Sequence, residues 1–250
     1  MTRLLSNHCP LYEAAQDSAG NGVAMMIAPA ALYFRDDEQA LADTILKVGL
    51  LKQRDPRGIA AAAAIAYLCK EALHCYSFSE LSSRNFLQFI QSIEHRAAAL
   101  LGQQEHRDCF SKALKSLLGL LHQPQEQVLG HIERVANRSS NRRVGVSSGY
   151  ALASVMTSLY IALTADNFED GLIDIVNLGG DADTTAAMTG AILGALYGRS
   201  GIPKRWLHDL VAKNAFDDRI EPLLQRPSSW QPQRSLLSQE IAWTELMAKK

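Results

Sequence analysis

The sequence predicts an all-α fold, and three observations support this prediction. Apolar residues recur at the 3.6-residue helical period over most of the chain after residue 36. No stretch alternates apolar and polar residues for long enough to form a useful β-strand. The 250 residues are 47% hydrophobic and 20% charged, which suits a single domain with a sizeable core. We therefore expect one multi-helix domain over residues 1–226 and a tail over residues 227–250.

The expected helices of the first half begin at recognisable signals. Four apolar residues after residue 36 share one helix face: Ala40, Leu41, Ile45 and Val48. Asp55 and Pro56 then begin an alanine-rich helix that reaches about Leu73, because aspartate is a favoured N-cap and proline a favoured first helical residue. The same period predicts three further helices, over residues 83–101, 109–122 and 125–136.

The second half continues with a long apolar helix from residue 150 to Leu163 and a shorter one from Phe168 to Val176. A last helix runs to residue 198, and small residues recur in it every four positions: Ala186, Gly190, Gly194 and Gly198. Glycine inside a helix costs about 1 kcal/mol relative to alanine. We therefore expect another helix to approach this ridge closely, with the helix itself buried.

The segment before that last helix, residues 177–185, is the strongest candidate site. Two glycines allow a tight turn, and three oxygen-bearing side chains follow it: Asp181, Asp183 and Thr184. Oxygen ligands in this number suit a hydrated magnesium ion. Two carboxylates exceed what one helix cap needs, and they repel each other unless a cation lies between them. Ordinary capping of the helix N-terminus remains the alternative.

A second candidate is the turn-rich loop over residues 17–22, which contains Gly20, Asn21 and Gly22 before an apolar stretch. Small residues let backbone N–H groups approach an anion, so the loop can cradle a pyrophosphate. An Asn-Gly pair is also common in ordinary turns, and this alternative stays open.

The net charge of −1 offers no basic field for nucleic acid and no polybasic surface for a membrane. The basic residues Arg138, Arg142 and Arg143 are interpreted as a solvated loop.

The four cysteines show no zinc-site or disulfide spacing, so we expect reduced thiols. Residues 1–10 hold no apolar run typical of a secretion signal, and no later run is long enough to span a membrane. We therefore expect a cytoplasmic protein with a small-molecule or protein partner.

Three segments together resemble the ADP-ribosylglycohydrolase family, which includes enzymes that remove ADP-ribose from dinitrogenase reductase. One segment runs from Ser148-Gly149-Tyr150 through Asn177-Leu178-Gly179-Gly180-Asp181-Ala182-Asp183-Thr184-Thr185 to Trp206-Leu207. The others are Ser18-Ala19-Gly20-Asn21-Gly22, followed by Met25, and Asp55-Pro56-Arg57 at the start of the alanine-rich helix. The resemblance covers most of the chain from about residue 17 to residue 224.

The resemblance implies an all-α fold and hydrolysis of the N- or O-glycosidic bond between ADP-ribose and a protein side chain or a small molecule. It implies that three residues form the C-terminal set of ligands for two magnesium ions: Asp181, Asp183 and Thr184. It implies a role in binding the pyrophosphate of ADP-ribose for four loop residues: Ser18, Gly20, Asn21 and Gly22. The leaving group, whether arginine, serine or a small molecule, is left open.

The departures from the family pattern are also informative. The family opens with a helix bearing an acidic residue and later carries a Thr-Asp-Asp run, and this chain begins downstream of both, so no catalytic residue is assigned. Met26 stands where the family has arginine, and Gln53 where it has histidine. Two carboxylates are too few for two adjacent dications, so we expect the chain alone to hold one magnesium ion or none. A catalytically impaired binder of ADP-ribose or of a protein is the alternative, and uncovered apolar surface predicts self-association or a partner chain.

Overall fold

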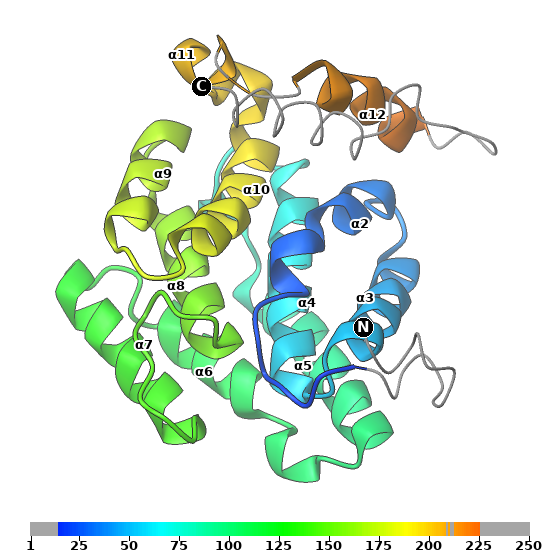
Figure 1. Cartoon of the computed structure of the whole chain (residues 1–250), viewed down its shortest axis with the longest axis vertical. Coiled ribbons are helices and arrows are strands. Elements are labelled where there is room, and N and C mark those ends of the chain that lie inside the picture. The colour runs from blue at the N-terminus through cyan, green and yellow to red at the C-terminus, as the bar shows by residue number, and fades with distance from the viewer. Residues whose placement is uncertain (1–14, 209, 211–212, 226–250) are drawn as a thin grey trace, which may run out of the picture. The chain divides into compact units, whose positions relative to one another are not determined.

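The computed structural model describes residues 15–208, 210 and 213–225 (Figure 1). The chain divides into two compact units, Met1–Gly201 and Ile202–Lys250. The α-helices of the first unit are α2 (Ala28–Tyr33), α3 (Glu38–Lys52), α4 (Pro56–Ala72), α5 (Ser83–Leu101), α6 (Cys109–Leu118), α7 (Gln125–Ser139), α8 (Ala151–Thr164), α9 (Phe168–Asn177) and α10 (Ala182–Gly201). Its short 3₁₀ helices are η2 (Ala24–Met26), η3 (Phe78–Glu80) and η4 (Gln104–His106), and the second unit contains α11 (Lys204–His208) and α12 (Lys213–Gln225).

The all-α prediction is confirmed over the described part of the chain, where the only extended pairings are two isolated β-bridges. The helix over residues 83–101 has the predicted bounds. Helix α6 ends at Leu118 rather than at residue 122, because the chain turns at Gly119. The boundary expected after residue 226 falls inside the second unit, and the tail over residues 227–250 lies outside the described residues, so that division stays a prediction.

Helix α4 forms the centre of the first unit and contacts α2, α3, α5, α8 and α10. Nearly all of its residues are buried, and half of the buried ones are alanines, so helices approach it from several sides. On α3, Leu41 and Ile45 are buried as predicted, whereas Ala40 and Val48 are only half-buried. The buried face of α3 also includes Gly49, where an added Cβ atom would lie 2.7 Å from a side-chain carbon of Ile59 in α4.

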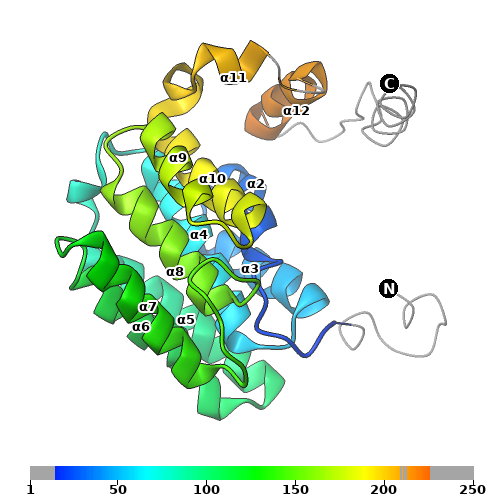
Figure 2. The same ribbon diagram turned by 60° about the vertical axis from the view of Figure 1, so that its left-hand side comes forward.

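Helices α8, α9 and α10 lie side by side (Figures 1 and 2). The expectation of a buried α10 with a tightly packed glycine ridge is wrong. Only one face of α10 is buried, and Cβ atoms added at Gly190 and Gly194 would make ordinary contacts of 3.6 and 3.8 Å with α9. The tight approach is instead at Gly171 of α9, where a Cβ atom would lie 2.5 Å from Leu193. Gly198 lies at a kink, with φ +64°.

Cys69 is buried, and burial raises the pKa of its thiol to about 12. Cys75 and Cys109 are half-buried free thiols, and Cys9 lies outside the described residues. These observations agree with the expectation of reduced thiols for the three described cysteines. No helix among the described residues has both the length and the apolar composition needed to cross a membrane.

A buried carboxylate joins α5 to α6. Glu94 is fully buried, and its two carboxylate oxygens accept hydrogen bonds from the backbone N–H groups of Phe110, at 2.6 Å, and Ser111, at 3.0 Å. It therefore caps the N-terminus of α6 from a neighbouring helix. Burial raises the pKa of Glu94 from 4.5 to about 7, although the hydrogen bonds from Ser111 and Phe110 oppose this shift.

This pKa predicts a pH-dependent stability. Because the folded-state pKa of Glu94 lies above the unfolded value, its contribution to stability is fully present below pH 4.5 and is lost as the pH rises through 7. Between pH 5 and 8, wild-type protein should lose roughly 1–3 kcal/mol of unfolding free energy relative to Glu94→Gln. Urea unfolding at several pH values measures this difference, with the exposed Glu126→Gln as the control. Parallel pH profiles for wild type and Glu94→Gln would contradict the assignment.

Candidate functional site

The turn before α10 is shaped by two glycines with positive φ angles, +67° at Gly179 and +66° at Gly180. A Cβ atom on Gly180 would lie 2.1 Å from the backbone carbonyl oxygen of Ser147. The N–H of Asp181 donates to that same carbonyl at 2.9 Å. The start of α10 is therefore in close backbone contact with the segment that precedes α8.

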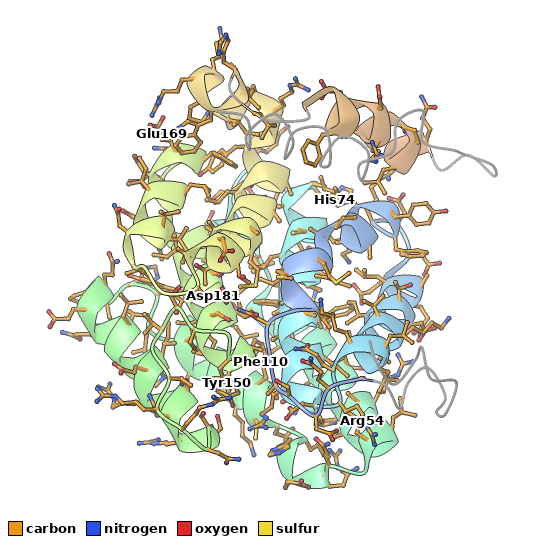
Figure 3. The ribbon with its side chains drawn as sticks, in the orientation of Figure 1. Arg54, His74, Phe110, Tyr150, Glu169 and Asp181 are labelled. Carbon is orange, nitrogen blue, oxygen red and sulfur yellow. The ribbon has the colours of Figure 1, made fainter. Side chains whose placement is uncertain are left out.

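The side chain of Asp181 does not cap its own helix. Asp181 Oδ2 accepts a hydrogen bond from Asn21 Nδ2 at 2.7 Å, whereas the N–H of Thr184 donates to Asp183 Oδ1 at 2.8 Å. Among the described residues, no N–H of α10 donates to the carboxylate of Asp181. The capping alternative therefore lacks its expected hydrogen bond at Asp181, although Asp183 makes a local one. Figure 3 shows Asp181 where α10 begins.

The oxygen cluster at the start of α10 consists of Asp181, Asp183 and Thr184. Asp181 and Thr184 are half-buried and Asp183 is exposed. The Thr184 hydroxyl also lies 3.9 Å from the sulfur of Met25. Oxygen donors of this kind are chemically suited to magnesium. Among the described residues, no group of three or more His, Cys, Asp or Glu side chains could hold a metal ion. The acidic groups of the cluster are therefore the carboxylates of Asp181 and Asp183 alone, and Thr184 adds one hydroxyl.

The loop over residues 17–22 is fixed from two sides. The N–H of Asn21 donates to the carbonyl of Gly149 at 3.1 Å, and the N–H of Ala151 donates to the carbonyl of Ala19 at 2.8 Å. On the other side, Gln53 Nε2 donates to the carbonyl of Gly20. A Cβ atom on Gly20 would lie 2.9 Å from this amide nitrogen, so a larger residue there would displace the end of the Gln53 side chain. Gln53 therefore positions the loop.

Asn21 joins this loop to the oxygen cluster across 160 residues of sequence. The residue is 8% exposed, and its amide nitrogen also lies 3.2 Å from the hydroxyl of Ser154 in α8. The structure therefore brings the two candidate segments together. It directs the amide nitrogen of Asn21 to Asp181, which the sequence did not predict.

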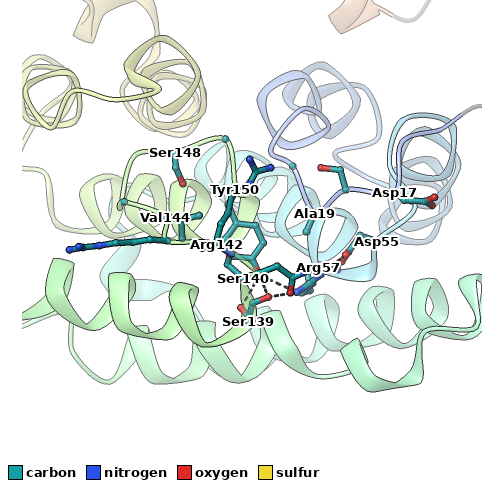
Figure 4. A pocket seen from close by; sticks show the side chains of 16 residues that line it. Asp17, Ala19, Asp55, Arg57, Ser139, Ser140, Arg142, Val144, Ser148 and Tyr150 are labelled. Atoms are coloured by element: carbon teal, nitrogen blue, oxygen red, sulfur yellow. Dashed lines mark hydrogen bonds and ion pairs between the residues drawn. The ribbon is translucent and has the colours of Figure 1, made fainter. Parts of the chain in front are cut away.

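A pocket of about 630 Å³ borders the other side of the loop (Figure 4). Its walls include Ser18, Gly20, Asp55, Arg57, Arg142, Arg143, Ser148 and Tyr150. Of the four predicted loop residues, Ser18 and Gly20 line it, whereas Asn21 and Gly22 do not. The expectation that Arg142 and Arg143 belong to a merely solvated loop is therefore incomplete. The hydroxyl oxygen of Ser148 is buried and has no hydrogen-bond partner among the described residues.

One wall of the pocket is fixed by an ion pair that sequence reasoning did not assign to the site. Arg57 Nη2 lies 2.6 Å from Asp55 Oδ2, and its Nη1 donates to the carbonyl of Ser139 at 2.7 Å and to the hydroxyl of Tyr150 at 3.2 Å. Burial lowers the pKa of Arg57, but the hydrogen bond and charge of Asp55 outweigh it and keep the pKa above its ordinary value. The Asp-Pro-Arg motif at a helix start was the available signal.

A model of the ADP-ribosylglycohydrolase family matches residues 1–234. The ADP-ribosylarginine hydrolase Tri1 of Serratia proteamaculans (strain 568) is 44% identical over 77 residues, which are 31% of this chain and 21% of that protein. The ADP-ribosyl-[dinitrogen reductase] glycohydrolase of Rhodospirillum rubrum is 45% identical over 69 residues, 28% of this chain and 24% of that protein.

Proteins that match over more of the chain have a lower sequence identity to it. The ADP-ribosylhydrolase ARH3 of Mus musculus is 30% identical over 227 residues, which cover 82% of this chain and 58% of that protein. A solved structure of an ADP-ribosylglycohydrolase-related protein complex has the same fold, with a TM-score of 0.63 and 23% identity over 90% of this chain and 66% of that chain. The chain therefore spans little more than half the length of the mouse relative. It belongs to the ADP-ribosylglycohydrolase family.

Proposed function

We propose that the chain is a magnesium-dependent ADP-ribosylglycohydrolase that hydrolyses the glycosidic bond between ADP-ribose and a protein side chain or a small molecule. Family membership supports the reaction class. The observation that carries the proposal is the hydrogen bond between Asn21 and Asp181, which joins the glycine-rich loop to the oxygen cluster. The two segments that the proposal assigns to ADP-ribose and to magnesium are therefore direct neighbours in the fold.

The pyrophosphate of ADP-ribose would lie against the glycine-rich loop. The N–H of Gly20 donates to no other described residue, and Gly20 borders the pocket, so this donor is available to an anion. Arg142 and Arg143 on the pocket wall add positive charge, and Arg143 also lies 3.8 Å from a carboxylate oxygen of Glu133. These features favour a dianionic ligand over a neutral one.

Magnesium would be held by Asp181, Asp183 and Thr184. When bound, the ion would supply orientation of the ribose hydroxyls and of a water at the anomeric carbon. The chain's own contribution is to hold Asp181 in place through Asn21, with one carboxylate oxygen bonded to the amide. Cleavage of a glycosidic bond passes through an oxocarbenium-like transition state, which nearby negative charge stabilises.

A second candidate function is binding without turnover. It is favoured by the small number of acidic groups, because the described residues bring only two carboxylates to the cluster. Two adjacent magnesium ions need more negative charge than that. Met25, whose sulfur lies 3.9 Å from the Thr184 hydroxyl, is 43% exposed and the adjoining Met26 is 50% exposed, which leaves apolar surface for a second copy or a partner chain.

The two functions are separated by two measurements on the same sample. Calorimetric titration with ADP-ribose, in magnesium and then in chelator, measures binding. Release of ADP-ribose from ADP-ribosylated arginine and serine peptides measures turnover. Magnesium-dependent binding with release supports the enzyme, and binding without release supports the binder. A folded sample that binds ADP-ribose in neither buffer would contradict the enzyme and the ADP-ribose binder alike.

A further inference from the structure

The side-chain amide of Asn21 has several hydrogen-bond acceptors within the protein. Its amide nitrogen lies within hydrogen-bond distance of three acceptors, namely Asp181 Oδ2 at 2.7 Å, the Ser154 hydroxyl at 3.2 Å and the Ser148 carbonyl at 3.4 Å. The nitrogen carries only two hydrogens, so these acceptors compete. The bond to Asp181 is the shortest and has a carboxylate acceptor, so it is the strongest of the three.

The backbone of Asn21 is equally constrained. Its N–H donates to the carbonyl of Gly149, and the preceding carbonyl, that of Gly20, accepts from Gln53. A movement of the Asp181 carboxylate therefore acts directly on the side chain of Asn21, which belongs to the loop. The coupling between the carboxylate and the loop needs no further residue between them.

We propose that Asn21 is a positioning residue that couples cation binding at Asp181 to anion binding at the loop over residues 17–22. This inference rests on the proposed function, because it takes magnesium and ADP-ribose as the two ligands. A cation at Asp181 fixes the carboxylate, the carboxylate fixes the side chain of Asn21, and this side chain then loses less conformational entropy when the loop binds pyrophosphate. By linkage, ADP-ribose must raise magnesium affinity by the same factor that magnesium raises ADP-ribose affinity.

The test measures that factor in both directions. Calorimetry gives the Kd of ADP-ribose with saturating magnesium and with chelator, and the Kd of magnesium with and without ADP-ribose. In wild type the two ratios should agree, at roughly 5- to 150-fold. In Asn21→Ala both ratios should fall below those of wild type by the same factor, while the Kd of ADP-ribose in chelator changes much less. Circular dichroism melting verifies that the variant is folded.

Two further variants separate coupling from structure. Ser154→Ala removes a competing acceptor of Asn21 but leaves the bond to Asp181, so its ratios should equal or exceed those of wild type. Asn21→Asp sets a second carboxylate against Asp181, and the repulsion is relieved only when a cation binds. Its ratio should therefore rise above that of wild type, which a loss of structure cannot produce.

The outcomes distinguish this inference from the proposed function. If wild type binds ADP-ribose equally well with and without magnesium, or if Asn21→Ala keeps the wild-type ratio, the coupling role is wrong while ADP-ribose binding stands. The same conclusion follows if Asn21→Ala weakens binding equally in both buffers, because Asn21 is then only a binding or structural residue. If wild type binds no ADP-ribose in either buffer, the proposed function fails and the coupling fails with it.

Discussion

Replacing Asp181 by alanine is expected to weaken magnesium-dependent ADP-ribose binding by more than about 100-fold. Loss of an outer partner of a metal ligand alone costs 10- to 100-fold in metal affinity, and this substitution would remove a proposed ligand itself. It also removes the acceptor of the 2.7 Å hydrogen bond from Asn21, so the loop loses its contact with the cluster. Calorimetry with ADP-ribose in magnesium and in chelator measures the loss.

The matched control is Asp174→Ala. Asp174 is an exposed carboxylate on neighbouring α9, so its removal changes the net charge equally without touching the cluster. It should bind ADP-ribose as wild type does. If Asp181→Ala and Asp174→Ala bind ADP-ribose equally well in magnesium, Asp181 is not a metal ligand and the oxygen cluster has no part in function.

Replacing Gly180 by alanine is expected to lower the unfolding free energy by roughly 2–5 kcal/mol. Its φ of +66° is unfavourable for any residue with a Cβ atom. In addition, the new atom would lie 2.1 Å from the carbonyl oxygen of Ser147, and a backbone group cannot rotate away as a side chain can. Urea unfolding measures the change, and a midpoint shift at constant m value identifies it as lost stability.

Gly179→Ala separates the cost of the positive φ from the cost of the contact with Ser147. Gly179 has nearly the same φ, +67°, but a Cβ atom there would meet nothing within 4 Å. It should therefore cost only the backbone penalty of about 1–2 kcal/mol. Equal losses in the two variants would show that the contact with Ser147 contributes nothing. Because Asp181 follows directly, Gly180→Ala should also weaken magnesium-dependent binding more than Gly179→Ala does.

The helices could be predicted because their signals are local. The Asp55-Pro56 start of α4 and the period of α5 gave bounds within a residue or two of those observed. The two candidate segments were also visible, since glycines and clustered oxygen side chains are marked in the sequence itself. The glycine ridge on α10 was misinterpreted, because spacing shows that a close approach is possible and not that a neighbour makes it.

The amino-acid sequence by itself therefore determined the fold class and most helix bounds, and it supplied the residues that we propose to bind an anion and a cation. Only the tertiary structure decided how they are used. It directed the carboxylate of Asp181 to Asn21 instead of its own helix, and it placed Arg142 and Arg143 on a pocket wall. The physical reason is that periodicity and capping depend on neighbours within about one helical turn. The Asn21–Asp181 bond instead joins groups 160 residues apart, and packing alone sets such contacts.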